Sequence, residues 1–224
     1  MCGRFVGFRS LEELKENFPI DKADCEVTAS YNVAPSQEIL AIINMAGENR
    51  LDKFHWGLVP FWSKDISIGN RMINARSETI AEKPSFRNAF KKRRCLILAD
   101  GFYEWKGEKG HKQPMFITLP DRKPFAFAGF WETWNKKSDS ASIYKSCTII
   151  TTQASETFSK IHHRMPVILK SEFYEPWLDP QNHDLDALKN ILKNEIHTEL
   201  LSCPVSKQVN SASHNNPSCI EPIA

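Results

Sequence analysis

The segment Cys95–Trp105 has the sequence CLILADGFYEW, and its first half is the clearest strand in the chain. The residues CLILA form a short apolar run of the length that buried strands have. A similar segment, Ala128–Trp134, has the sequence AGFWETW and follows another apolar run at 124–128. The repetition has two interpretations that spacing alone does not separate. Either two strands of one sheet end alike, or Glu104, Glu132 or both close a pocket.

Strands and short helices are predicted on both sides of this segment. The sequence SLEE at Ser10–Glu13 is a capping box and predicts a helix over 10–18. The tail from Cys203 is rich in Pro, Ser and Asn and is expected to be mostly extended. Hydrophobic patterning predicts further helices at 84–94, 154–161, 171–177 and 184–192, and strands at 38–44, 53–59, 95–99, 115–119, 124–128, 146–151 and 167–169.

The order of these elements indicates the fold class. Strands outnumber helices and do not alternate with them regularly, which favours an α+β fold over a doubly wound one. No segment is long enough to separate two domains. We therefore expect a single domain over residues 1–224, with a mainly antiparallel, barrel-like β-sheet core flanked by short helices.

The composition is that of a globular chain. It has 224 residues, 41% of them hydrophobic and 25% charged, and a formal net charge of +2, which excludes intrinsic disorder. No apolar run approaches the ~18 residues that span a bilayer, and no secretory signal follows Met1. The six cysteines form no C-x-x-C pair, so a zinc site is not expected. We expect a cytoplasmic protein with reduced thiols.

The small net charge conceals an uneven distribution. Residues 71–94 carry eight basic and two acidic side chains, a local net charge of +6 that leaves −4 for the rest of the chain. Within this segment, Arg87, Lys91 and Arg94 have the spacing of residues on one helical face. Such a face can follow a phosphate backbone, and an ordinary solvated face is the alternative interpretation.

Cys2 can carry unusual chemistry if Met1 is removed, as it is when residue 2 is small. The cysteine then holds a free α-amine, with a reference pKa of ~7.7–8.0, beside a thiol with a reference pKa of ~8.5. The thiolate can attack an acyl carbon with the amine as base. Alternatively, the amine forms a Schiff base with an aldehyde, and the thiol closes on the imine carbon to give a five-membered thiazolidine.

Six short segments share one resemblance when they are taken in order and spacing. They are CGRF at Cys2–Phe5, YNVAP at Tyr31–Pro35, WGLVPFW at Trp56–Trp62, NARSE at Asn74–Glu78, GFYEW at Gly101–Trp105 and HHRMP at His162–Pro166. Together they resemble the SRAP (SOS-response-associated peptidase) family, the abasic-site processing proteins. The resemblance extends into the tail at 205–217 and covers essentially the whole chain.

The resemblance implies a covalent reaction with damaged DNA. SRAP proteins bind single-stranded DNA that contains an abasic site and form a thiazolidine with the ring-opened deoxyribose, with possible lyase and self-reversal activities. Cys2 matches the family nucleophile, and Asn74 matches the residue that holds the cysteine amine and the sugar. Glu104, rather than Glu132, matches the acid/base. His162 matches the histidine that assists ring opening and later reversal or strand cleavage.

The resemblance and the basic segment also suggest the DNA contacts. An apolar wedge at 60–62 can stack an unpaired base, whereas Trp56 is expected in the core. Of the adjacent histidines, His163 would point away from His162 in an extended chain. Abasic single-stranded DNA is the expected partner of a monomer that associates with the nucleoid when bound, without membrane, metal or organic cofactor. The predicted DNA contacts are Arg4, Trp62, Arg76, Arg87, Lys91 and Arg164.

Two other functions fit the same residues. Cys2, Glu104 and His162 could form a thiol peptidase that cleaves peptides or its own amino terminus. The chain could also be a single-strand-binding module that makes no covalent product. Such a module would bind intact DNA in a salt-dependent way.

Overall fold

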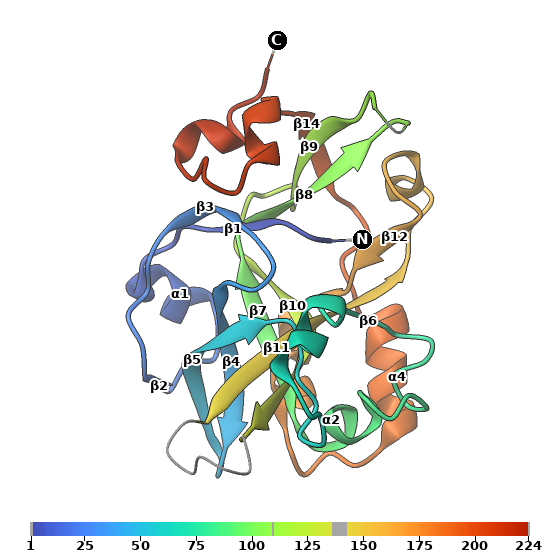
Figure 1. Ribbon diagram of the computed structural model, residues 1–224. Coiled ribbons are helices and arrows are strands. Elements are labelled where there is room, and N and C mark those ends of the chain that lie inside the picture. The colour runs from blue at the N-terminus through green and yellow to red at the C-terminus, as the bar shows by residue number, and fades with distance from the viewer. Residues whose placement is uncertain (1, 109, 136–142, 224) are drawn as a thin grey trace.

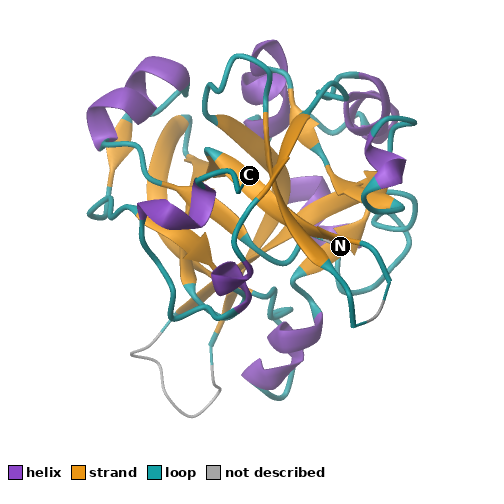
Figure 2. Cartoon of the chain, turned by 90° about the horizontal axis from the view of Figure 1, so that it is seen from above, coloured by secondary structure: helices purple, strands orange, loops and turns teal. Residues whose placement is uncertain are grey.

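Two sheets, both built mainly from antiparallel pairs, carry the fold (Figure 1). The computed structural model describes residues 2–108, 110–135 and 143–223. Within these residues, short helices lie around the outside of the strands (Figure 2). The expected α+β class is therefore confirmed. None of the described helices is long and apolar enough to cross a membrane.

The larger sheet contains a closed ring of strands. Its strand order is β12-β11-β10-β7-β4-β5-β2, with β13 beside β10 and β6 beside β11. Strand β5 also pairs in parallel with β11, so β5, β4, β7, β10 and β11 form the ring. The strands are β2 (Lys22–Ala23), β4 (Glu38–Met45), β5 (Glu48–Trp56), β6 (Asn74–Arg76), β7 (Arg94–Ala99), β10 (Phe125–Trp134), β11 (Tyr144–Gln153), β12 (Arg164–Pro166) and β13 (Ile168–Leu169).

The smaller sheet has the order β14-β9-β8-β1-β3, and all its pairs are antiparallel. Only Asp100 separates β7 from β8, so the segment Cys95–Trp105 passes from the larger sheet into the smaller one. The similar segments around Glu104 and Glu132 therefore lie in different sheets, not in one. The strands are β1 (Phe5–Gly7), β3 (Ser30–Val33), β8 (Gly101–Lys106), β9 (Gln113–Thr118) and β14 (Leu201–Pro204).

The helices are short, and two predictions about them are wrong. The helix expected at 154–161 is reduced to the 3₁₀ turn η2, and the tail beyond β14 forms two 3₁₀ turns, η4 and η5, rather than extended chain. The α-helices are α1 (Leu11–Asn17), α2 (Arg87–Lys92), α3 (Tyr174–Leu178) and α4 (Leu185–Asn194). The 3₁₀ turns are η1 (Ile66–Arg71), η2 (Phe158–Lys160), η3 (Ser171–Phe173), η4 (Lys207–Asn210) and η5 (Pro217–Ile220).

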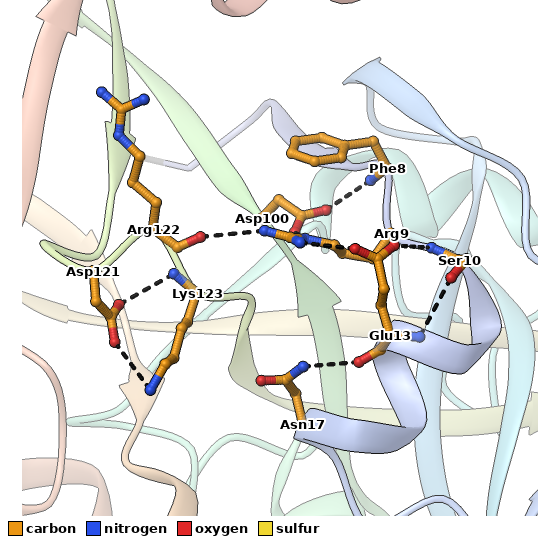
Figure 3. Close-up of polar contacts among 9 residues, drawn as sticks. All are labelled: Phe8, Arg9, Ser10, Glu13, Asn17, Asp100, Asp121, Arg122 and Lys123. Atoms are coloured by element: carbon orange, nitrogen blue, oxygen red, sulfur yellow. Dashed lines mark hydrogen bonds and ion pairs between the residues drawn. The ribbon is translucent and has the colours of Figure 1, made fainter.

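The predicted capping box starts α1 and connects it to the turn between the two sheets (Figure 3). Ser10 and Glu13 exchange the two hydrogen bonds of the box. Arg9 donates to Glu13 at 2.9 Å and to Asp100 at 3.0 Å. Asp100 also accepts from the backbone N–H of Phe8 at 2.7 Å. These contacts fix the chain that leaves β1 against the point where β7 passes into β8.

Strand β5 ends earlier than predicted. The strand expected at 53–59 stops at Trp56 because Gly57 turns the chain with a φ of +138°. A Cβ atom at Gly57 would lie 2.6 Å from the carbonyl oxygen of Gly69, so only glycine allows this close approach. Trp56 itself is buried, which confirms its expected place in the core.

Arg94 does not share a helical face with Arg87 and Lys91, so that prediction is wrong. Helix α2 ends at Lys92, and Arg94 is the first residue of β7, only 2% exposed. Its guanidinium donates to a set of backbone carbonyls that offset the cost of burying the charge. The acceptors are the carbonyls of Phe90, Lys91, Trp177, Asp179 and Asn182.

Candidate active site

Cys2 is completely buried just before β1, and Asn74 holds its backbone. The Nδ2 atom of Asn74 donates to the carbonyl of Cys2 at 2.8 Å. Asn74 is the first residue of β6, and it lies opposite Ile149 of the neighbouring strand β11. Its other amide atom, Oδ1, is buried and has no donor among the described residues. The site therefore offers a hydrogen-bond acceptor next to Cys2.

Glu104 lies on the strand beside Cys2. The backbone N–H of Tyr103 donates to the carbonyl of Arg4 at 3.0 Å, which places Glu104 alongside the residues that precede β1. Glu104 is only 3% exposed. Burial raises the pKa of the Cys2 thiol well above its ordinary value, and the charge of Glu104 raises it further. The thiol is therefore held in its protonated form at neutral pH.

His162 lies in the turn before β12, and its ring nitrogen Nδ1 contacts the backbone of Arg164. Nδ1 is 3.0 Å from the backbone nitrogen of Arg164 and 3.0 Å from its carbonyl oxygen. A neutral ring can accept from the N–H, which leaves its own proton on Nε2, and a charged ring can donate to the carbonyl. Burial lowers the pKa of His162, while the charge of Glu104 acts in the opposite direction. The neutral ring is therefore favoured at neutral pH.

The extended chain that would make the adjacent histidines point in different directions is not present. The chain turns at this point instead of extending, and the rings of His162 and His163 stack with centroids 4.3 Å apart. His162 is half-buried, and His163 is exposed. The interaction with His163 contributes to the lowered pKa of His162.

The two glutamates, which spacing alone did not separate, have different neighbours. Glu104 acts electrostatically on both Cys2 and His162. Glu132, which is 2% exposed, forms an ion pair with Arg93 instead. Burial raises the pKa of Glu132, and Arg93 opposes that rise.

Two predicted DNA-binding arginines are engaged by the protein itself. Arg4 donates to the side-chain oxygen of Asn32 at 2.7 Å and to the carbonyl of Val209 at 2.8 Å. Arg164 forms a two-pronged ion pair with Glu78, with distances of 2.6 and 3.0 Å. Arg4 thus ties the start of β1 to the carboxy-terminal segment, and Arg164 ties β12 to the residues after β6.

The other predicted DNA contacts are exposed. Trp62 is 48% exposed on the loop after β5. Arg76 is exposed on β6, the strand that also carries Asn74. Arg87 and Lys91 are exposed on α2, which lies at the lower end of the molecule in Figure 1, whereas the amino terminus is near mid-height.

Two residues that no sequence pattern singled out anchor the carboxy-terminal segment. Asn32 is 1% exposed, and its Nδ2 atom lies within 3.1 Å of three backbone carbonyls of residues 209–214. Trp105 donates from its ring nitrogen to the side chain of Asn210 at 2.7 Å. Asn32 lies in the motif YNVAP and Trp105 in the motif GFYEW, and membership of these motifs was the only feature of the sequence that pointed to them. The described residues contain no cluster of His, Cys, Asp and Glu that could hold a metal ion.

Comparisons with known proteins give consistent matches along the chain. The family model described as SOS response associated peptidase (SRAP) matches residues 1–212. The chain is 48% identical over 224 residues to the abasic site processing protein YoqW of Bacillus subtilis (strain 168), covering 99% of each chain. It is 30% identical over 229 residues to the abasic site processing protein YedK of Escherichia coli (strain K12), covering 100% of each. A crystal structure of a Bacteroides thetaiotaomicron protein matches with a TM-score of 0.85 and 25% identity, covering 100% of both chains.

Proposed function

Because the chain belongs to the SRAP (SOS response associated peptidase) family, we propose that it processes abasic sites by forming a thiazolidine between Cys2 and the lesion. The observation that carries the proposal is the convergence of Cys2, Asn74, Glu104 and His162 on one buried site. Single-stranded DNA with an abasic site is the substrate, and one copy of the protein captures one lesion.

The reaction needs two bonds to form at the aldehyde carbon of the opened sugar. Removal of Met1 leaves the α-amine on Cys2. The amine attacks the aldehyde carbon to give a carbinolamine, and the loss of its hydroxyl as water gives an imine. The Cys2 sulfur then adds to the imine carbon, while the thiol proton moves to the nitrogen. The product differs from the reactants only by one molecule of water, and no oxidant or reductant is required.

Glu104 and His162 supply the proton transfers of this sequence. Opening the sugar and losing the carbinolamine hydroxyl both require a proton donor, and such catalysis is typically worth about 10²–10⁴-fold in rate. In this scheme Glu104 protonates the leaving hydroxyl. His162, with Nδ1 held by Arg164, presents Nε2 for proton exchange. The buried Oδ1 of Asn74, which has no donor among the described residues, can accept a hydrogen bond from the α-amine.

The raised pKa of the Cys2 thiol favours attack by the amine first. A peptidase of the papain type needs a thiolate as its first nucleophile, and burial beside Glu104 opposes thiolate formation. The thiazolidine route needs only a protonated thiol that closes on an imine already formed. An imine that the thiol does not trap can also undergo β-elimination, which gives a competing strand-cleaving lyase reaction.

A denaturing gel tests this function. Wild-type protein mixed with abasic single-stranded DNA should give a heat-stable shifted band, and Cys2→Ala should abolish it. Cys25→Ala, which removes a half-buried thiol outside the site, is the matched control and should crosslink normally. A protein made with a residue retained before Cys2, verified by intact mass, should also fail. Normal crosslinking by that protein would contradict the thiazolidine mechanism.

A further inference from the structure

A second hollow lies apart from Cys2, between α2, the end of β10 and the loop after β5. It is an open groove of about 400 Å³, lined by Phe61, Asn88, Lys91, Lys92, Arg93, Glu132 and Thr133. Cys2, Asn74, Glu104 and His162 are not among its lining residues. The groove therefore needs an explanation of its own.

The walls of the groove combine positive charge with an exposed aromatic ring. Lys91 and Lys92 are exposed side chains from the last turn of α2, and Arg93 follows them directly. Phe61 is 54% exposed, which is unusual for a large apolar side chain. Cations beside an unpaired aromatic ring fit a nucleotide, whose phosphate takes the charge and whose base stacks on the ring.

Glu132 adds a second, independent feature at this place. One carboxyl oxygen pairs with Arg93, and the other is buried without a hydrogen-bond donor among the described residues. A buried acceptor without a donor is costly. An N–H group on a ligand could offset that cost, and nucleobases carry such groups on their edges.

Strand β11 connects the groove to the site. Its residue Ile149 lies opposite Asn74, which holds Cys2, and its residue Ser146 lies opposite Glu132. The hydroxyl of Ser146 also accepts from the backbone N–H of Val59, at the start of the loop that carries Phe61. Three residues of a strand span about 10 Å. The two places are therefore about 10 Å apart as measured along the backbone of β11.

We propose that this groove binds a nucleotide of the DNA strand that carries the lesion, with its base on Phe61 and its phosphate on Lys91 and Lys92. The proposal rests on the proposed function, because it assumes that abasic DNA occupies Cys2. It adds a base-binding subsite a few nucleotides from the lesion. Longer DNA should then bind more tightly than DNA that covers the lesion alone.

The test compares two oligonucleotides by fluorescence anisotropy. Both carry an unreactive tetrahydrofuran analogue of the abasic site, and their lengths are about 5 and about 15 nucleotides, within the range that single-strand sites cover. Wild-type protein should bind the longer one at least about tenfold more tightly. Phe61→Ala should weaken binding of the longer one by about five- to a hundredfold, as the loss of one stacked base predicts. Lys92→Glu should reduce its salt dependence by about one phosphate contact.

Lys193→Glu is the charge-matched control, because it reverses an exposed lysine in the last turn of α4, away from the groove. It should keep the wild-type difference between the two lengths. Equal affinities of wild-type protein for the two lengths, or full retention of the difference in Phe61→Ala and Lys92→Glu, would overturn the subsite. A wild-type protein that shows the length effect but forms no covalent adduct would instead overturn the proposed function and leave DNA binding in the groove established.

Discussion

The segments around Glu104 and Glu132 are alike in sequence but differ in what surrounds their carboxyl groups. Both glutamates are almost fully buried, at 3% and 2% exposure. Glu132 has a permanent cation beside it, Arg93, whereas Glu104 lies near groups that can themselves titrate, Cys2 and His162. A fixed cation makes a buried carboxylate a structural element. Titratable neighbours make it available for proton transfer.

The largest effect should come from neutralising Glu104. Glu104→Gln should slow covalent capture of abasic DNA by about 10²–10⁴-fold, because an amide can neither give nor take the proton. The measurement is the single-turnover rate of adduct formation on a denaturing gel. Urea denaturation of the same variant is measured in parallel, so that a slower reaction is separated from a loss of folded protein. A wild-type rate would show that the proton comes from another group.

Glu132→Gln should lower the stability of the protein rather than the rate of covalent capture. It leaves Arg93 without its charged partner, and removing one member of a buried pair is destabilising. Because Arg93 is 27% exposed, water offsets part of the loss, and we expect about 2 kcal/mol in the free energy of unfolding. Urea denaturation measures this value. A free energy of unfolding equal to that of the wild-type protein would show that Arg93 does not depend on the charge of Glu132.

The differing partners of the two glutamates also show where sequence information ends. The capping box at α1 and the buried strands β7, β10 and β11 follow from local patterns, because neighbouring residues determine them. Arg94 has helical spacing to Lys91, yet its burial depends on carbonyls of α3 and the turn after it. Arg4 could not be assigned from spacing either, because its acceptor in η4 lies 205 residues away.

Position after Met1 marked Cys2, and the rest of the candidate site was predictable only through the family resemblance. Cys2, Asn74, Glu104 and His162 lie in four separate segments, and no periodicity relates them. The sequence motifs selected Glu104 over Glu132, and the electrostatic contacts with Cys2 and His162 agree with that choice. The motifs could not indicate that Arg164 is paired with Glu78, because that contact depends on how β12 and the residues after β6 pack.

A smaller effect is expected at this second Arg–Glu pair. Glu78 is 48% exposed and Arg164 11% exposed, so the pair should contribute less than about 1 kcal/mol to stability. Glu78→Gln removes a charge that competes with phosphate for the guanidinium of Arg164. Affinity for undamaged single-stranded DNA, measured by anisotropy, should rise by about two- to fivefold. Weaker binding would show instead that Glu78 holds Arg164 in the geometry that DNA requires.

The smallest effect, and the most specific to Glu104, should be on the titration of His162. Burial lowers the pKa of His162 below 6.5, and the charge of Glu104 partly opposes this shift. Glu104→Gln removes the opposing charge, so the pKa of His162 should move further in the acid direction. NMR titration of the ring without DNA measures the midpoint independently of the reaction rate. Glu132→Gln is the matched control and should leave the midpoint in place, because Glu132 is not among the groups that shift it. The midpoint could instead move equally in both variants, or toward higher pH in Glu104→Gln. Either result would mean that the charge of Glu104 does not act on His162. The two glutamates would then differ less than their partners indicate.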